Sequence, residues 1–128
     1  MLLVPVYLDR SPLEGIGLFA KQPIAKGALI WRLDEHFDRV FSQELYEAQP
    51  ELVRDYLDRY SYPSKWLPGH YVFEADDAKY MNHSDEPNCD FSDGKLAYAL
   101  RDIAAREEMT CNYGGLFDGK PFAFLGER

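Results

Sequence analysis

The stretch KYMNHSDEPNCDF, from Lys79 to Phe91, decides how the rest of this 128-residue chain is interpreted. It places an Asn, a His, a Ser, two acids, a proline, a second Asn and a cysteine in close succession. Pro87 interrupts any helix here, and polar residues do not alternate with apolar ones as they do in a half-buried strand. We therefore expect a loop with a dense set of polar side chains. Taken alone, such a stretch is also typical of an Asx-rich loop that bonds its own backbone.

The composition is that of an ordinary globular protein, and the length favours a single domain over residues 1–128. Hydrophobic residues make up 46% of the chain and aromatic residues an unusually high 15%. The formal net charge is −8, which argues against nucleic-acid binding, because binding to phosphates relies on clustered basic side chains. An acidic chain suits a basic partner, such as a lysine-containing peptide. Acidic residues also serve simply to keep a protein in solution.

The two cysteines, Cys89 and Cys111, form no CxxC pair. Neither a disulfide scaffold nor a four-ligand zinc site can be built from them, and two free thiols suit a reducing cytoplasm. The N-terminal run MLLVPVYLDR has no basic start, no cleavage-like small residues and too few apolar residues to span a bilayer. The sequence therefore predicts a cytoplasmic protein that does not act in a membrane, as either a monomer or a homodimer.

The pattern along the chain predicts a mainly β domain with one small helical insert. Strands are expected at residues 2–8, 18–20, 28–33, 71–75 and 96–100, with a last short strand and a Gly-Gly turn within 108–114. The helical insert covers about residues 42–60, where Ser42 suits the N-cap of a first helix and Pro50 the first turn of a second. Spacings of four residues place the apolar side chains of that second helix on one stripe, made of Leu52, Val53, Tyr56 and Leu57.

The segment GIGLFA, residues 15–20, matches the G-x-G-x-x-G/A pattern of dinucleotide-binding folds, and Asp34 follows at about the expected distance. That pattern works where its end opens a helix whose N-terminus holds the pyrophosphate. Here the helix would run through KQPIAKG, where Pro23 and Gly27 forbid it. A Rossmann fold is therefore excluded. The two glycines either let the backbone approach a ligand or make a tight turn.

Three segments in order resemble the SET domain, the fold of lysine methyltransferases. GIGLFAKQPIAKGALI resembles the first cofactor-binding loop of that family, and ALRDIAAREEMTCNYGG resembles its closing motif. The most specific element lies between them, Asn82-His83-Ser84 followed by Pro87-Asn88-Cys89. Together the segments cover residues 13 to 115. The resemblance implies a SET-domain fold of short β-sheets, with a C-terminal pseudoknot-like crossing in which the closing segment threads under the Asn-His-Ser loop.

The resemblance also implies an enzyme, a protein-lysine N-methyltransferase that uses S-adenosyl-L-methionine. By it, the cofactor lies between the crossing and the glycine loop, where the main chain of Gly15, Ile16 and Gly17 contacts it. Asn82 is implied to bind the amino-acid end of the cofactor, and the main chain of His83 to bind its adenine. Tyr113 is implied as the catalytic tyrosine, at the floor of a narrow channel for the target lysine.

Other residues are candidates for the same site. Tyr71, Tyr80 and Tyr98 are further candidates for the lysine channel, although none lies on a motif. A metal site is not expected, because the spacing of His83, Asp85, Glu86 and Cys89 matches no closed tetrahedral site. A thiol nucleophile paired with His83 is conceivable, but nothing in the local pattern supports one.

The C-terminal segment GLFDGKPFAFLGER departs from the family, because it lacks the cysteine-rich zinc segment that many members carry there. Zinc is therefore not expected, and Phe117, Phe122 or Phe124 are candidates to complete the channel instead. Two further departures concern the closing motif. Arg106 stands where glycine is common, and Asn112 stands where an acid is common.

The implied chemistry needs a neutral lysine amine, whose pKa in water is about 10.4. A narrow apolar channel beside a sulfonium cation lowers that pKa, so little dedicated acid–base machinery is expected. The alternative function is a non-catalytic peptide-binding or interaction module on the same fold. Asn82, His83 and Tyr113 occurring together favour the enzyme.

Overall fold

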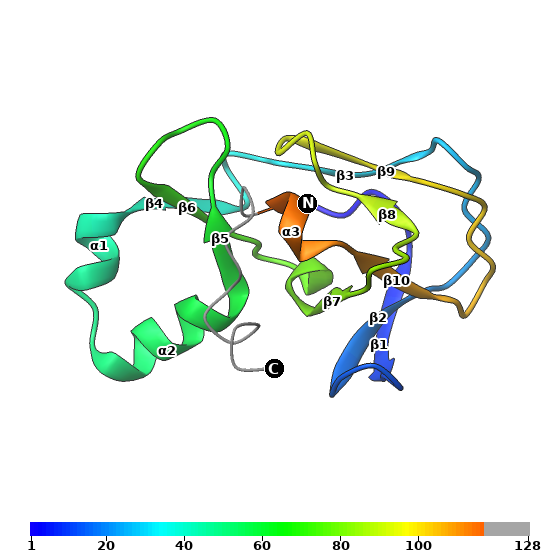
Figure 1. The fold of residues 1–128 in the computed structure, drawn as a ribbon, viewed down its shortest axis with the longest axis horizontal. Coiled ribbons are helices and arrows are strands. Elements are labelled where there is room, and N and C mark those ends of the chain that lie inside the picture. Colours follow the sequence, from blue (N-terminus) through cyan, green and yellow to red (C-terminus); the bar gives the residue numbers. More distant parts are fainter. Residues whose placement is uncertain (117–128) are drawn as a thin grey trace.

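The computed structural model describes residues 1–116 (Figure 1) and shows a mainly β protein with one helical insert, as predicted. The strands are β1 (Val6–Arg10), β2 (Ile16–Ala20), β3 (Leu29–Arg32), β4 (Arg39–Ser42), β5 (Ser61–Pro63), β6 (His70–Phe73), β7 (Asn82–His83), β8 (Cys89–Asp90), β9 (Leu96–Ala99) and β10 (Glu108–Cys111). The helical elements are α1 (Gln43–Glu47), α2 (Glu51–Tyr60), the 3-10 helix η1 (Asp77–Tyr80) and α3 (Tyr113–Leu116).

The strands form three small sheets, ordered β1-β2-β10-β7, β3-β9-β8 and β4-β6-β5. Figure 1 shows the third sheet beside the helical insert on the left, and the β1–β2 hairpin to the right of centre at the lower edge of the molecule. In the first sheet, β10 pairs antiparallel with β2, where Met109 is opposite Leu18. On its other side β10 pairs parallel with β7, where Thr110 is opposite Asn82. The last strand within residues 1–116 therefore lies between the second strand and the Asn-His-Ser loop.

The predicted crossing is present, and the side chain of Asn88 holds it together. Asn88 is 1% exposed, and its Nδ2 donates to the carbonyl oxygen of Glu108 at 2.8 Å and to Glu107 Oε2 at 2.9 Å. Its Oδ1 accepts from the backbone N–H of Thr110 at 2.8 Å. One amide thus binds the backbone of β10 through both of its polar atoms. A further backbone hydrogen bond, from Ser84 N to the Cys111 carbonyl oxygen at 3.0 Å, joins the Asn-His-Ser loop to the end of β10.

The hydrophobic core is built mainly from the first two sheets, with Tyr62 and Val72 from the third. Leu18 from β2, Trp31 from β3 and Met109 from β10 are at most 1% exposed. The ring of Trp31 packs against that of Phe91, with centroids 5.1 Å apart. Burial of such large apolar side chains contributes about 2 kcal/mol each, so the core fixes the two sheets against each other and with them the loops that they carry.

The helical insert begins as predicted, because the Ser42 hydroxyl oxygen accepts from the backbone N–H of Leu45 at 3.1 Å and so caps α1. Pro50 occupies the N-cap of α2 rather than its first turn. The apolar stripe predicted for α2 lies largely in solvent, since Leu52 is 81% exposed and Tyr56 44% exposed. Ring contacts instead attach the helix, with Tyr56 5.8 Å from Phe73 between centroids.

Several predicted boundaries were wrong for identifiable reasons. The first strand begins at Val6 and not at residue 2, because Pro5 has no N–H for a sheet ladder; Leu2 forms only an isolated bridge with Trp31. The second strand begins earlier, at Ile16. The strands β4 and β5 were missed, since each is short and pairs with β6 rather than showing an alternating pattern of its own. The strands β7 and β8 were missed as well, because these two-residue strands lie within the polar segment that was expected to be a loop.

The predicted Gly-Gly turn is instead the start of a short helix, α3. Glycine has a poor helix propensity, but Asn112 precedes the helix and its Oδ1 accepts from the backbone N–H of Gly114 at 2.9 Å. This side chain supplies the partner that an orphan N–H at a helix start requires. A local cap has therefore overridden the intrinsic preference of the two glycines.

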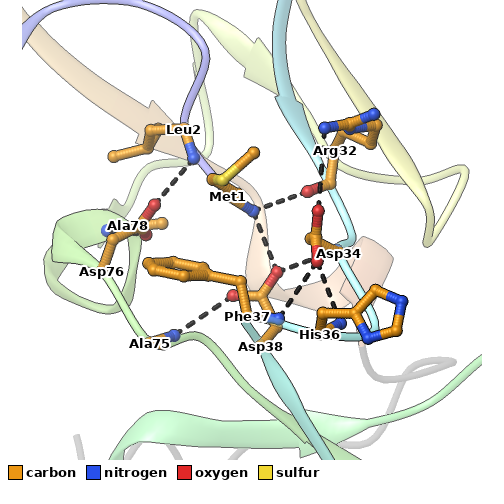
Figure 2. A network of polar contacts seen from close by, with 10 residues as sticks. All are labelled: Met1, Leu2, Arg32, Asp34, His36, Phe37, Asp38, Ala75, Asp76 and Ala78. Carbon is orange, nitrogen blue, oxygen red and sulfur yellow. Dashed lines mark hydrogen bonds and ion pairs between the residues drawn. The ribbon is translucent and has the colours of Figure 1, made fainter.

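A buried carboxylate joins the N-terminal segment to the middle of the chain (Figure 2). Asp38 is 3% exposed and accepts from the backbone N–H of Ala75 at 3.1 Å and of Asp34 at 3.0 Å, as well as from the amino group of Met1 at 3.0 Å. Nearby, Asp76 accepts from the backbone N–H of Leu2 at 2.7 Å. The segment after β6 is thereby fixed in an acidic environment. No helix within residues 1–116 has the length and apolar character needed to cross a membrane.

Replacement of Asn88 should destabilise the protein strongly. Asn88→Ala leaves the N–H of Thr110 without its partner inside the core, and we expect a loss of about 3 kcal/mol in the free energy of unfolding. Urea denaturation followed by circular dichroism measures it. Asn112→Ala, which removes an exposed amide, is the matched control and should cost less than about 1 kcal/mol. Equal losses for the two variants would contradict the assigned role of Asn88.

Candidate functional site

A cavity of about 270 Å³ opens where the β1–β2 hairpin, the end of α2, η1, β7 and the start of α3 meet. Four of the residues predicted for the site, from three distant parts of the sequence, share its wall: Gly15, Ile16, Asn82 and Tyr113. The remaining lining residues are Glu14, Arg59, Tyr60, Lys79 and Tyr80. The sequence prediction singled out Tyr80 among these only as a channel candidate, and it missed the other four.

A second cavity, of about 30 Å³, adjoins the first and shares Tyr113 with it. Arg59, Tyr60 and Lys79 also line both cavities. The residues that line the smaller cavity alone are more buried and mostly apolar or aromatic: Tyr62, Glu74, Ala78, Met81, Phe91 and Cys111. Tyr113 is thus the predicted catalytic residue and also part of the wall common to a larger and a smaller space.

Asn82 connects the Asn-His-Ser loop to the glycine hairpin. Its Nδ2 donates to the carbonyl oxygen of Glu14 at 3.0 Å and to Glu108 Oε2 at 3.0 Å. Glu108 in turn accepts from the Ser11 hydroxyl at 2.8 Å. The carboxylate of Glu108 therefore joins the hairpin, the loop and β10. Glu108 lies in the closing motif, but no role was predicted for it from the sequence.

The two glycines of the hairpin differ in what they do. Gly15 has a φ of +45°, a conformation in which L side chains are strained, and it lines the larger cavity. Gly17 lies within β2 and does not line the cavity; a Cβ atom there would stand 2.4 Å from Glu108 Oε2. The second glycine thus makes room for the side chain that binds Asn82, so its effect on the cavity is indirect.

The imidazole of His83 fixes the backbone of Tyr113. His83 Nδ1 lies 3.0 Å from the backbone N of Tyr113, whose N–H must donate, so Nδ1 carries no proton. The hydrogen of the neutral ring is then on Nε2, which donates to Asp85 Oδ1 at 2.9 Å. Both ring nitrogens are engaged, so His83 is not arranged as a general base. Its side chain is also not among those that line the two cavities.

Tyr113 is held at both ends. Besides the bond from its N–H to His83, its hydroxyl donates to the carbonyl oxygen of Met81 at 2.5 Å. The residue follows β10 directly and begins α3, so the crossing sets its position. A hydroxyl fixed in this way within a cavity wall is suited to orienting a reacting group, because a preorganised dipole needs no rearrangement during a reaction.

The other tyrosine candidates differ in whether they line a cavity. Tyr80 lines the larger cavity, whereas Tyr71 does not; its hydroxyl donates to Gln43 Oε1 at 2.5 Å and its ring stacks on Phe41. Tyr98 is 38% exposed on β9 and lines neither cavity. Phe117, Phe122 and Phe124, which were predicted to complete the channel, lie outside the described residues.

The lining includes cations that sequence reasoning missed. Lys79 Nζ lies 5.3 Å from the ring centroid of Phe73 and 5.5 Å from that of Tyr80, distances typical of cation–π contacts. Arg59 sits over the ring of Tyr60 at 5.8 Å. A usable signal for Lys79 was its place, three residues before Asn82. Arg59 had none, because its helix was assigned only by its apolar periodicity.

Neither a metal nor a thiol nucleophile finds support. Within residues 1–116 no group of three or more His, Cys, Asp and Glu side chains could hold a metal ion. Both cysteines are buried and free. Burial raises the pKa of the Cys89 thiol to about 12 and that of Cys111 well above its ordinary value. A thiolate is the reactive form of cysteine, so neither thiol is activated near neutral pH.

The sequence is similar to those of known proteins. The SET domain family model matches residues 15–114. The histone-lysine N-methyltransferase, H3 lysine-4 specific, of Candida albicans is 30% identical over 85% of this chain and 11% of its own length. The histone-lysine N-methyltransferase trr of Drosophila melanogaster is 30% identical over 84% of this chain and 5% of its own length. The chain thus spans about a tenth or less of these curated relatives.

Among solved structures, the Polycomb Repressive Complex 2 of Chaetomium thermophilum in an autoinhibited conformation, bound to S-adenosylmethionine, has a TM-score of 0.66. It is 24% identical and is matched over 89% of this chain and 16% of the other chain, so it shows the fold alone. The match of the family model, by contrast, extends over most of the sequence and includes all six residues predicted for the site. This protein belongs to the SET domain family.

Proposed function

We propose that this protein is a methyltransferase that transfers a methyl group from S-adenosylmethionine to the lysine ε-amine of a protein substrate. The observation that carries the proposal is the larger cavity, where Gly15, Asn82 and Tyr113 come together from distant segments. The names of the curated relatives, histone-lysine N-methyltransferases, support the same reaction. The S-adenosylmethionine in the Polycomb complex supports the cofactor.

The residues of the larger cavity fit this cofactor. Its carboxylate suits the cations Lys79 and Arg59, and its ammonium suits the acid Glu14. The rings of Tyr60 and Tyr80 offer aromatic surface to an adenine and to a sulfonium cation. When bound, the cofactor supplies an electrophilic methyl group on a sulfonium centre. The cavity volume of about 270 Å³ is at the lower end of small-molecule sites.

The protein contributes positioning. Tyr113 stands in the wall between the two cavities, and bonds to His83 and Met81 prevent it from turning away. A lysine chain that reaches the smaller cavity therefore passes a fixed hydroxyl beside the cofactor residues. Holding an amine in line with a methyl group can lower the activation free energy by several kcal/mol, on the order of 7. The buried aromatic lining excludes water from the same place.

The proposed substrate is a basic, lysine-containing protein or peptide. A formal net charge of −8 attracts such a partner and repels nucleic acid. The names of the curated relatives specify histone lysines as their substrates, and histones are basic proteins. The cytoplasmic location and the monomeric or homodimeric state stay predictions.

The decisive assay is methyl transfer. The protein is incubated with S-adenosylmethionine labelled in its methyl group and with a panel of lysine-rich proteins, including histones, followed by mass spectrometry. Labelled lysine in at least one protein is expected. Cofactor binding with no transfer to any substrate would favour the alternative, a non-catalytic peptide-binding or interaction module. Absence of both would refute the proposed function.

Asn82→Ala should weaken cofactor binding. The change removes the amide that holds Glu14 and Glu108 together, so the hairpin loses its bond to the loop. We expect the dissociation constant for S-adenosylmethionine to rise at least tenfold, since a lost buried hydrogen bond to a charged group costs about 1.5 to 3 kcal/mol. Isothermal titration calorimetry measures it. Gln49→Ala, which removes an amide that follows α1 and does not line the cavity, is the control.

Tyr113→Phe should separate binding from turnover. The ring of residue 113 and its packing remain, while the hydroxyl that donates to the Met81 carbonyl oxygen is lost. Cofactor affinity should therefore change by less than about threefold. The turnover number should fall by about 100-fold, because the lost group acts chiefly in the transition state. Steady-state kinetics at saturating cofactor provides the measurement. Unchanged turnover would move the catalytic role to another residue.

Salt should raise the KM for the peptide substrate much more than the KM for the cofactor. Attraction between an acidic surface and a basic peptide acts over exposed distances that ions screen, with a Debye length of about 8 Å at 0.15 M. Raising NaCl from low to high concentration should therefore increase the KM for a lysine-rich peptide several-fold more than that for S-adenosylmethionine. A peptide KM that stays constant would show that shape, and not charge, selects the substrate.

A further inference from the structure

Glu74 is a buried acid that faces the smaller cavity and has no role in the mechanism so far. It follows β6 directly, is 5% exposed, and lines the cavity of about 30 Å³ together with Tyr113. Within residues 1–116, its Oε2 has no hydrogen-bond partner. The hydroxyl of Tyr62 is hydrogen bonded to the same carboxyl group. One oxygen of the acid is thus buried without a donor.

The surroundings of Glu74 oppose its ionisation. Burial, followed by the charges of Asp76 and Asp38, raises the pKa of Glu74 from 4.5 to about 8, while the amino group of Met1 and the Tyr62 hydroxyl act in the lowering direction. The described residues form no salt bridge to Glu74. The other charged or titratable groups that line the same cavity are Arg59, Tyr60, Lys79, Cys111 and Tyr113.

A buried carboxyl group of this kind calls for a cation with a hydrogen to donate. Leaving a buried polar atom unpaired costs about 1 to 3 kcal/mol, and an ionised one costs more. The ε-ammonium of a lysine brings both a positive charge and an N–H donor. A lysine that passes Tyr113 therefore meets, in the smaller cavity, the group that its charge requires.

We propose that Glu74 accepts the proton of the substrate lysine in this cavity. The inference rests on the proposed function. In the step, one N–H bond of the ε-ammonium breaks and an O–H bond forms on the Glu74 carboxylate. The electron pair left on nitrogen then forms the bond to the methyl carbon, while the carbon–sulfur bond breaks and its pair goes to sulfur. The products are a methylated ammonium, a neutral thioether and a protonated Glu74.

Four other groups, His83, Tyr113, Tyr62 and Cys111, are unsuited to this task. Both nitrogens of His83 are engaged, and the Tyr113 hydroxyl gives its hydrogen to Met81. Burial raises the pKa of Tyr62 and of Cys111 well above their ordinary values. A proton acceptor works best when its pKa is close to the working pH, and Glu74, at about 8, meets that condition.

The test compares Glu74→Gln with wild type over pH 6 to 10. Loss of a general base typically costs about 100-fold or more, so kcat at pH 8 should fall by that amount. The wild-type rate should level off above pH about 8 as Glu74 becomes ionised. The variant depends on the spontaneously neutral amine, so its rate should keep rising about tenfold per pH unit toward the ordinary lysine pKa of about 10.4.

Two measurements guard against a merely structural effect. Glu44→Gln, an exposed residue of α1, changes the net charge equally and should leave kcat and its pH profile unchanged. The raised pKa means that native Glu74 holds its proton between pH about 4.5 and 8 while the unfolded chain releases it. Wild-type stability therefore falls across that window. Glu74→Gln should remove this fall, stay folded at pH 8 and bind S-adenosylmethionine as wild type does.

Tyr62→Phe provides a second, independent variant. Its hydroxyl lowers the pKa of Glu74, so its loss should move the levelling-off of the wild-type rate to higher pH while the plateau rate is kept. A direct titration of the Glu74 carboxyl carbon by ¹³C NMR should show an inflection close to pH 8 without any turnover.

The outcomes distinguish the proposed methyltransferase function from the proposed role of Glu74. A wild-type protein that transfers no methyl group would refute the proposed function itself. If the wild type methylates lysine and Glu74→Gln retains its kcat and pH profile, the role of Glu74 is overturned while the function stands. An NMR inflection below pH 6 would overturn it as well.

Discussion

The structure depends on one buried amide. Asn88 binds β10 through both its donor and its acceptor, and β10 is the strand to which the glycine hairpin and the Asn-His-Ser loop are both attached. The parallel ladder between β10 and β7 has only two residue pairs, Thr110 opposite Asn82 and Cys111 opposite His83. Such a short ladder contributes little by itself. A side chain that satisfies all its polar atoms inside the core supplies the register that the ladder lacks.

The crossing explains how so small a chain organises a site. Tyr113 leaves β10 at the point where Asn88 and the β7 pairing have fixed its direction, and the His83 ring then fixes its N–H. Asn82 and Glu108 draw the hairpin against the same strand. The residues around the cavity are therefore held by neighbours in β10 and not by long helices or large sheets. Short elements suffice because each is bound at its end by a specific polar contact.

Sequence could predict the parts of this arrangement that depend on local chemistry. The polar loop, the capped helix at Ser42 and the failure of the Rossmann pattern all follow from residue types and spacing, as does the mainly β class. The ordered motifs located Gly15, Ile16, Asn82 and Tyr113, which share one cavity. The roles of Gly17 and His83 were less accessible, because both act through contacts with residues far away in the sequence.

Other features could not have been read from the sequence at all. Glu74 looks like any acid at the end of a strand, and only its burial, together with the charges of Asp76 and Asp38, makes its pKa unusual. Arg59 faces a cavity because its helix lies against the aromatic rings of the third sheet. The exposed stripe of α2 shows the converse, since a periodic apolar pattern predicts a helix but does not say how much of it is buried.

The close approach of Gly17 to Glu108 has a consequence for how this sequence can evolve. The space beside position 17 is filled by the carboxylate, so any side chain there, even a methyl group, demands a shorter or displaced residue at position 108. A shorter residue in turn releases Ser11 and Asn82. The two positions are therefore coupled. Compensated pairs of substitutions at 17 and 108, and not single ones, are the route by which the hairpin can diverge.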